Sequence, residues 1–431
     1  MKPEIAIIGG GYAGLACAVA LARSERVRVT VFESGRVLGG RARVVARQDP
    51  PIDNGQHLLI GAYTQLLQMM RQVGVPPRVL ESLPLTIAYP DGFELRAARL
   101  PAPFHLAVGL ARARGLGWRD RVAAAKLIHG LRRRGWQVSP DRPVARLLAE
   151  LGQTTTLRDR LWEPLCVAAL NTPAIEASAQ VFANVLRDSL AAGSASSELL
   201  IPRIDLSELF PVPATRWLGR RGHGVRTSDP IRAIRVEDDV FWLDGGPTWA
   251  GYNQVVVATA PYHAAPLLAP FPALAGVCKS IDGLDHQPIT TIYLHYEKSP
   301  MTGAPMTGLT GGPAQWLFDR GRLGGPPGLL AAVVSARSPF DDQPHEALEL
   351  AVQRQLEQAY GRLPPPAWIR TIAERRATFS CTPDLARPGN QTPMPGLWLA
   401  GDYTHGPYPA TLEGAVRSGL AAARGVLATL D

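Results

Sequence analysis

The sequence predicts an α/β protein in which a discontinuous nucleotide-type domain is interrupted by a second, mixed α+β domain with a helical segment. Two observations predict this fold. An apolar run at residues 5–8, a glycine-rich turn, a helical pattern and a second strand at residues 27–33 form a βαβ unit of the usual length. Strand-like segments with the same texture recur at residues 216–261 and 397–400. One domain must therefore collect pieces that lie far apart in the chain.

Between these pieces the composition changes. Residues 95–171 are rich in Leu, Ala and Arg and are typical of helices, whereas residues 266–379 mix strands with helical stretches. A last helix is expected at residues 412–427. We therefore predict a nucleotide domain made of residues 1–90, 206–265 and 386–431, with a helical segment at 91–205 and a sheet part of the second domain at 266–385.

Length and composition narrow the class of protein. The 431 residues suffice for more than one domain, and 46% apolar with 19% charged residues fit a folded chain. The four cysteines lie far apart without a Cys-x-x-Cys pair, which excludes a zinc ribbon and disfavours a disulfide framework. We expect no metal and a reducing cytoplasmic setting.

No secretory signal or stretch of about 20 apolar residues is visible. The net charge of +8 fits nucleic acid or an anionic membrane equally well. No nucleic-acid-binding module is recognisable, so we expect no nucleic acid partner.

The strongest local motif is Gly-Gly-Gly-Tyr-Ala-Gly at residues 9–14, between the first strand and the first helix. In such a motif the first glycine permits a tight turn, the second lets the backbone approach a pyrophosphate, and the third lets helix and strand pack closely. The helix N-terminus offers N–H groups to the phosphates, and an acid at the end of the second strand accepts hydrogen bonds from a ribose. The residues expected at this half of the site are Gly9, Gly11, Tyr12, Ala13, Gly14, Glu33 and Ser34.

Two further segments carry a resemblance. Gly-Gly-Arg at residues 39–41 follows the acid closely, and Leu-Ala-Gly-Asp at 399–402 precedes Pro-Ala-Thr-Leu-Glu-Gly at 409–414. With these segments the chain resembles the flavin amine oxidase and carotenoid desaturase superfamily. The resemblance implies a Rossmann-like, GR2-type domain that binds FAD non-covalently. It places Gly40 and Arg41 beside the pyrophosphate and flavin.

The C-terminal segments complete that implied site. Gly401 and Asp402 would bind the ribityl chain, and the last helix, beginning at Thr411 and Leu412, would point N–H groups at the pyrimidine edge of the flavin. Such a helix end stabilises negative charge. Ile231 and residues 257–261 match the superfamily's middle segment, where a backbone group reads the adenine; an ordinary core strand explains them equally well.

Residues 53–57, Asp-Asn-Gly-Gln-His, fall where the superfamily places a loop beside the isoalloxazine ring. Gly55, Gln56 and His57 are therefore expected at the cofactor. His57 is either a proton donor or a packed histidine, since its pKa can be tuned near neutrality.

A narrower resemblance depends on Leu-Trp-Glu-Pro-Leu-Cys at residues 161–166, Ala-Leu-Asn-Thr-Pro at 169–173 and Leu-Phe-Pro-Val-Pro-Ala at 209–214. These strings, with the Asp-Asn-Gly-Gln-His loop, look like the squalene-associated desaturase group, whose named activity is hydroxysqualene dehydroxylation in bacterial squalene and hopanoid synthesis. The resemblance implies reduction of hydroxysqualene to squalene, with an acid that helps the hydroxyl leave as water. Candidate acids are His57, Glu163, Tyr403 and His405. For Glu163 we expect burial among Trp162, Pro164 and Leu165 to raise the carboxyl pKa.

Three alternatives stay open at this point. A carotenoid-type desaturase would take hydride from a polyisoprenoid, and an amine oxidase would act on an amine. A flavin-binding scaffold for prenyl synthases would have no activity of its own.

Residues 101–134 interleave apolar and basic side chains and end in three consecutive arginines, residues 132–134. A Trp- and Leu-containing helix with an Arg-rich face suits a membrane interface, and a solvated face over a domain core is the other reading. An apolar polyisoprenoid substrate favours the first. We expect a cytoplasmic protein peripheral to the inner membrane, with possible contacts to prenyl synthases. The expected lipid contacts are Arg112, Arg114, Arg119 and Arg121.

Overall fold

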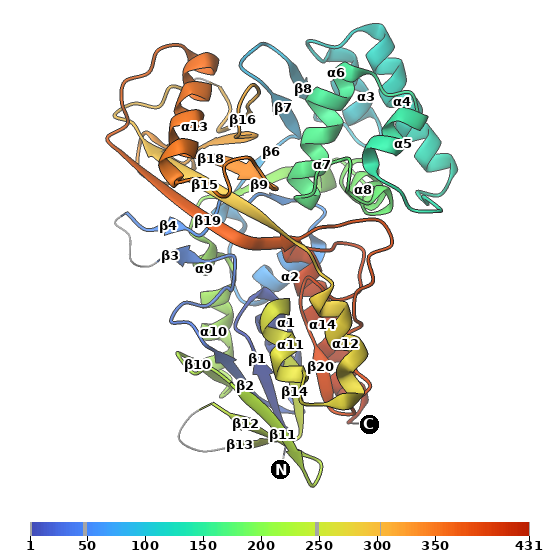
Figure 1. Ribbon diagram of the computed structural model, residues 1–431, viewed down its shortest axis with the longest axis vertical. Coiled ribbons are helices and arrows are strands. Elements are labelled where there is room, and N and C mark those ends of the chain that lie inside the picture. Colours follow the sequence, from blue (N-terminus) through green and yellow to red (C-terminus); the bar gives the residue numbers. More distant parts are fainter. Residues whose placement is uncertain (1, 46–49, 246–249, 302, 431) are drawn as a thin grey trace.

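The computed structural model describes the whole chain except residues 1, 46–49, 246–249, 302 and 431. Two halves lie one above the other along the long axis (Figure 1). The lower half contains a parallel sheet and both chain ends, and the upper half contains an antiparallel sheet and most of the helices of residues 100–190.

The lower sheet is built from strands that are distant in sequence. Its five strands are all parallel, in the order β10-β2-β1-β14-β20. Their bounds are β1 (Glu4–Ile8), β2 (Arg28–Glu33), β10 (Gly224–Thr227), β14 (Gln254–Val257) and β20 (Leu397–Leu399). The prediction of an α/β fold with a discontinuous nucleotide domain is confirmed.

Both faces of this sheet are covered, because alternate residues of each strand point to opposite sides. Ile5 and Ile7 belong to one buried cluster and Ala6 and Ile8 to another. Helices α1 (Tyr12–Arg23), α2 (Thr64–Gln72), α9 (Leu206–Leu209), α10 (Pro211–Gly219) and α14 (Leu412–Ala428) contribute to the first cluster. On the other face lie α11 (Pro261–Leu268), α12 (Ala275–Asp282) and a small antiparallel sheet of β11 (Ala233–Glu237), β12 (Val240–Asp244) and β13 (Ala250–Tyr252).

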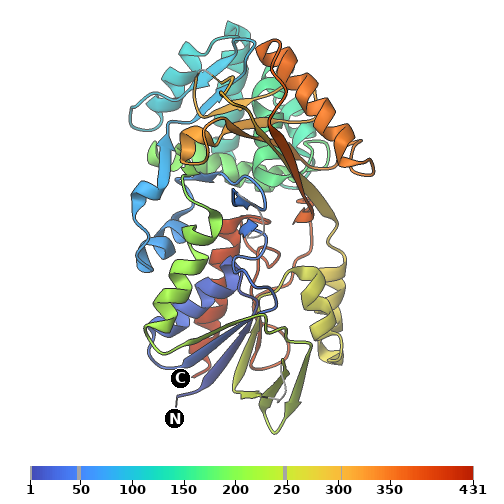
Figure 2. The same ribbon diagram turned by 90° about the vertical axis from the view of Figure 1, so that its left-hand side faces the viewer.

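The two ends of the chain meet inside the first layer. Helices α1 and α14, blue and red in Figure 2, pack side by side. Their contact is close, since a Cβ at Gly419 would lie 2.1 Å from the carbonyl oxygen of Ala13. This contact brings the N-terminal glycine motif and the C-terminal segment to one edge of the sheet.

The strand-like segment predicted within residues 216–261 is interrupted near its start. Strand β10 ends at Thr227 and β11 begins only at Ala233. Ser228 has a φ of 56°, which strand geometry does not allow, and Pro230 lacks a backbone N–H. The two strands accordingly belong to different sheets.

The upper half is organised around an antiparallel sheet in the order β16-β17-β18-β15-β19. Its strands are β15 (His286–His295), β16 (Met306–Gly308), β17 (Trp316–Asp319), β18 (Leu329–Ser335) and β19 (Trp368–Phe379), and α13 (His345–Tyr360) packs on it. The long strands β15 and β19 reach down toward the lower half (Figure 1).

Further helices complete the upper half, and short strands lie within it and at its junction with the lower half (Figure 1). The helices are α3 (Phe104–Arg112), α4 (Trp118–Arg133), α5 (Val144–Glu150), α6 (Thr155–Leu157), α7 (Glu163–Leu170) and α8 (Ala179–Leu186), with π-helical turns at Arg158–Trp162 and Arg187–Ala191. The short strands are β3 (Val44–Val45), β4 (Ile52–Asp53), β5 (Leu59–Ile60), β6 (Leu80–Leu83), β7 (Thr86–Ala88), β8 (Glu94–Arg96) and β9 (Leu199–Pro202). No helix in the described part of the chain is both long and apolar enough to cross a bilayer.

Candidate functional site

A cavity of about 1310 Å³ lies where the two halves meet. This volume exceeds the range of about 300–1,000 Å³ that is common for single small-molecule sites. Its lower wall contains the residues that follow β1, β2, β14 and β20, the carboxyl edge at which open parallel sheets bind ligands. The cavity therefore has room for an extended dinucleotide together with a second molecule.

The three motif glycines have different structural roles. Gly9 has a φ of +118°, and a Cβ there would lie 2.5 Å from the carbonyl oxygen of Ala258. At Gly14 a Cβ would lie 2.0 Å from the carbonyl oxygen of Gly9, so both positions need glycine for the fold itself. At Gly11 a Cβ would meet only the Cα of Gly40, at 3.9 Å. The free protein thus leaves open space at Gly11, beside the N–H groups at the start of α1.

Glu33, at the end of β2, faces the same cavity. Its carboxylate accepts hydrogen bonds from the backbone N–H groups of Gly10, at 2.8 Å, and Gly35, at 2.7 Å. A carboxylate offers about four acceptor positions, so it keeps capacity for ribose hydroxyls. Ser34 beside it also lines the cavity.

An ion pair links the N-terminal and C-terminal parts of the cavity wall. An Nη2–H of Arg41 donates to Oδ1 of Asp402 at 2.6 Å, and Nη1 of Arg41 donates to the carbonyl oxygen of Ala377 at 2.7 Å. Asp402 is buried in the turn that follows β20. Residues 361 positions apart are thus fixed to each other at the centre of the site.

Helix α14 begins in the cavity wall. Oγ1 of Thr411 caps the helix by accepting from the N–H of Gly414 at 2.9 Å, and Thr411 and Leu412 both line the cavity. The positive end of the helix dipole at this point favours a ligand atom that carries negative charge.

The loop at residues 53–57 is fixed from both halves. Oδ1 of buried Asp53 accepts from the N–H of Leu206 at 2.9 Å, and the Tyr293 hydroxyl donates to the carbonyl oxygen of Asp53 at 3.1 Å. Burial raises the pKa of Asp53 to about 6. These bonds hold Gly55, Gln56 and His57 in the cavity wall.

The protonation of His57 follows from its surroundings. Its Nδ1 lies 3.0 Å from the carbonyl oxygen of Gly55, to which it can only donate. Burial lowers the pKa of His57, and the bond to Gly55 opposes that shift. At pH 7 the imidazole is therefore mainly neutral, with its proton on Nδ1 and a lone pair on Nε2.

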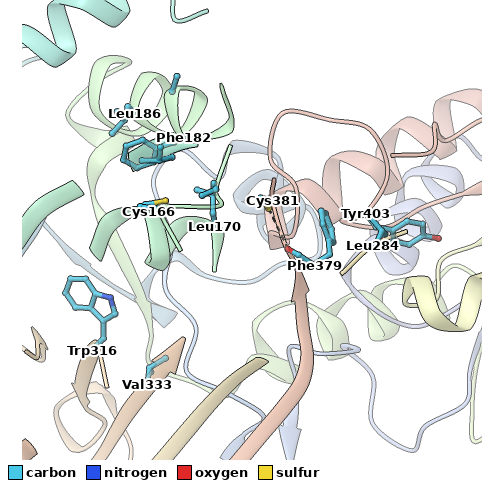
Figure 3. Close-up of a cluster of buried hydrophobic side chains, with 14 of the residues drawn as sticks. Cys166, Leu170, Phe182, Leu186, Leu284, Trp316, Val333, Phe379, Cys381 and Tyr403 are labelled. Carbon is cyan, nitrogen blue, oxygen red and sulfur yellow. Dashed lines mark hydrogen bonds between the residues drawn. The ribbon is translucent and has the colours of Figure 1, made fainter. Parts of the chain in front are cut away.

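The upper part of the cavity is an apolar chamber. Figure 3 shows Trp316 and Val333, on strands β17 and β18, opposite Leu170 on α7. The side chains that line this chamber are Leu85, Ile87, Leu165, Leu170, Val185, Leu190, Ile289, Met306, Trp316, Phe318 and Val333. Sequence reasoning missed these residues, because an apolar side chain at a chamber wall looks the same in sequence as one in a solid core.

Of the expected cofactor residues, all except Gly14 line the cavity, including Ile231 in the segment between β10 and β11. Gly14 lies behind the turn, where it allows the contact with Gly9. Among the described residues, no three His, Cys, Asp or Glu side chains are grouped as metal ligands.

The four candidate acids differ in their position relative to the cavity. His57 lines the cavity, whereas Glu163, Tyr403 and His405 do not. His405 is exposed. Tyr403 is buried beside Leu284 and Phe379 (Figure 3), its hydroxyl has no hydrogen-bond partner in the described chain, and burial raises its pKa.

The expected burial of Glu163 is wrong. Its side chain remains 34% exposed, and its Oε1 lies 3.2 Å from Nη2 of Arg158. The π-helical turn at Arg158–Trp162 precedes Glu163 directly, and this local geometry was not visible in the sequence.

Comparison with known proteins places this geometry in a family. The family model described as "Flavin containing amine oxidoreductase" matches residues 12–427. Hydroxysqualene dehydroxylase of Rhodopseudomonas palustris is 32% identical, with 99% of each chain covered. The enzyme of the same name from Sinorhizobium fredii is 30% identical over 98% of each chain. Zeta-carotene desaturase of Synechocystis is 24% identical, covering 99% of this chain and 97% of its own.

Solved structures share the fold. An oxidoreductase from Methanosarcina mazei superposes with a TM-score of 0.77 at 16% identity, covering 98% of this chain and 100% of its own. Cyclohexylamine oxidase from Brevibacterium oxydans superposes with a TM-score of 0.72 at 18% identity, covering 100% of both chains.

Proposed function

This chain belongs to the flavin-containing amine oxidoreductase family and is an FAD-dependent oxidoreductase, and on this premise we propose that it reduces hydroxysqualene to squalene. The observation that carries the proposal is the similarity to hydroxysqualene dehydroxylase of Rhodopseudomonas palustris, which is 32% identical with 99% of each chain covered. The desaturase relatives are more distant, at 24% identity or less over comparable lengths.

The residues of the cavity fit FAD. The open space at Gly11 and Gly40 beside the start of α1 suits the pyrophosphate, and Glu33 suits the adenosine ribose. Asp402 would bind the ribityl chain, and the start of α14 would face the flavin. Reduced FAD, when bound, supplies the hydride and is oxidised in the exchange.

The chain's own side chains supply the remaining requirements of the proposed reaction. A C–O bond is broken, a C–H bond forms, and the hydroxyl takes a proton and leaves as water. The apolar chamber suits a polyisoprenoid chain, and a chain seated there would exclude water that could otherwise capture a cation-like carbon. We assign the proton to Nε2 of His57, which must first be protonated from solvent because the neutral ring carries its proton on Nδ1.

The proposal is tested by a single turnover without oxygen. Holoprotein that has been reduced with dithionite and freed of excess reductant is mixed with hydroxysqualene, and squalene is quantified by mass spectrometry. We expect about one squalene per bound FAD, and none from unreduced holoprotein. Absence of squalene, together with desaturation of zeta-carotene by the oxidised protein, would replace the proposal by the desaturase reading.

We also expect the FAD to be released intact by acid. No cysteine lines the cavity among the described residues, and burial raises the pKa of the Cys381 thiol to about 12, which keeps it protonated and unreactive. Acid precipitation should therefore leave the yellow chromophore in the supernatant. Flavin absorbance that stays with the washed pellet would contradict a non-covalent site.

A further inference from the structure

The net charge of the protein resides in one segment. Residues 98–134 contain nine of the 45 Lys and Arg residues but one of the 37 Asp and Glu residues, Asp120. The rest of the chain carries 36 of each sign, so the whole excess of +8 lies in this segment. We call it the α3–α4 surface; it forms the outer end of the upper half, far from the chain termini (Figure 1).

Large apolar side chains are exposed on the same surface. Phe104 is 63% and Trp118 69% exposed, and Leu100 and Val122 are exposed by 41% and 45%. These are four of the six large apolar side chains that are exposed in the described chain. Scattered single exposed apolar residues are common, but the concentration of four of them in one segment, Trp and Phe included, is typical of an interaction site.

Helix α3 is oriented with an apolar stripe outward. Phe104, Ala107 and Ala111 recur at helical spacing and are exposed, whereas His105 and Gly109 are buried. Gly109 packs so closely on β8 that a Cβ would lie 2.7 Å from the carbonyl oxygen of Arg96. The fold therefore holds the apolar stripe of α3 toward solvent.

Two of the four arginines expected at lipid have other contacts. Arg121 donates to the carbonyl oxygens of Leu110 and Ala113, at 3.2 and 3.0 Å, and so caps the C-terminus of α3. Arg114 pairs with Glu94 at 2.6 Å. Arg112 and Arg119 are exposed, and the guanidinium of Arg119 lies 5.5 Å from the ring centre of Trp118. Arg114 and Arg121 thus have partners within the protein, and the lipid contact expected of all four arginines is carried here by Arg112 and Arg119.

We propose that the α3–α4 surface binds anionic phospholipid. Phe104 and Trp118 would enter the headgroup region, and Arg112, Arg119 and the arginines at the end of α4 would contact the lipid phosphates. Exposed aromatic side chains among arginines, with nearly no acid, are the composition of an interfacial helix pair. The inference is independent of the proposed reaction, because it depends only on the charge and exposure of this surface.

The test uses FAD-loaded protein and sucrose-loaded vesicles of phosphatidylglycerol and phosphatidylethanolamine, with phosphatidylcholine vesicles for comparison. We expect the parent to sediment with the anionic vesicles only, and less in high salt. Each arginine near an anionic surface is worth about fivefold in affinity, so Arg112→Gln/Arg119→Gln should lower the partition coefficient about 25-fold. The double variant Phe104→Ser/Trp118→Ser should also lower the partition coefficient without any arginine being changed. Both side chains are exposed, so their replacement leaves the core intact.

The matched control is Leu350→Ser/Arg354→Gln on α13, where both residues are also exposed. It should bind vesicles like the parent, and flavin absorbance reports that every variant is folded. Equal binding by the α3–α4 variants and the parent would overturn the proposal. The proposal would also be overturned if the parent did not bind anionic vesicles but self-associated or bound RNA through Trp118.

Discussion

Gly11→Ala is expected to abolish FAD retention while the protein stays folded. In the free protein the new methyl group would meet only the Cα of Gly40, at 3.9 Å, and Gly11 has a φ of −79° that alanine adopts readily. The conflict arises only with a bound pyrophosphate. Overpacking of this kind costs about 1–3 kcal/mol, which at its upper end raises Kd about 10²-fold. Flavin absorbance per protein, and titration of the apoprotein with FAD, measure the effect.

Variants at two other glycines distinguish loss of FAD binding from misfolding. Gly276→Ala lies in α12, where a Cβ meets nothing within 4 Å, and should keep full flavin occupancy. Gly14→Ala would bring a methyl group within 2.0 Å of the carbonyl oxygen of Gly9, so a lower Tm and poor soluble yield are expected. A Gly11→Ala protein with parental FAD content would place the pyrophosphate elsewhere.

His57→Ala is expected to keep FAD and to lower the single-turnover rate by about 10²–10⁴-fold, the usual contribution of a positioned acid. Its matched comparison is Glu163→Gln, which should turn over like the parent, because Glu163 pairs with Arg158 outside the cavity wall. The rate of flavin oxidation by hydroxysqualene in a stopped-flow instrument measures both. A parental rate in His57→Ala would assign the proton to another group.

The pH dependence of the single-turnover rate is a second test of His57 as the proton donor. The donor form is the imidazolium, and burial lowers the His57 pKa below its ordinary value. The parental rate should therefore rise as pH falls from 8 and level off only below that lowered pKa. Asp53, whose pKa is raised to about 6 by burial, titrates nearby. Persistence of the pH profile in His57→Ala would show that Asp53 or another group controls the rate.

The cofactor half of the site was predictable because its signals are local. A turn that needs Gly9 and Gly14, an acid at the end of a strand and a capped helix start each follow from a few adjacent residues. The βαβ spacing then fixes where those residues meet in space. The resemblance to the flavin superfamily predicted that the N-terminal and C-terminal segments form one site. The contact between α1 and α14 brings those segments together.

The apolar chamber was not predictable in the same way. Trp316 and Phe318 on β17 and Ile87 on β7 come together only after the upper half has folded, and their apolar character also suits a core. Glu163 and Arg121 show the converse limit. Glu163 pairs with Arg158 and Arg121 caps a helix end, and the sequence spacing revealed neither contact. The expected burial of Glu163 was therefore wrong, whereas the lipid contact of Arg121 stays a prediction.

The packing of α1 on α14 also sets when the protein can mature during its synthesis. Arg41 and Asp402 lie 361 positions apart, so β1, α1 and the glycine turn are translated long before β20 and the start of α14. Until they emerge, Arg41 lacks its carboxylate partner and β14 lacks its neighbour β20. We therefore expect FAD to be retained only once β20 and the start of α14 have folded, so chains that stop before about residue 400 should lack the cofactor.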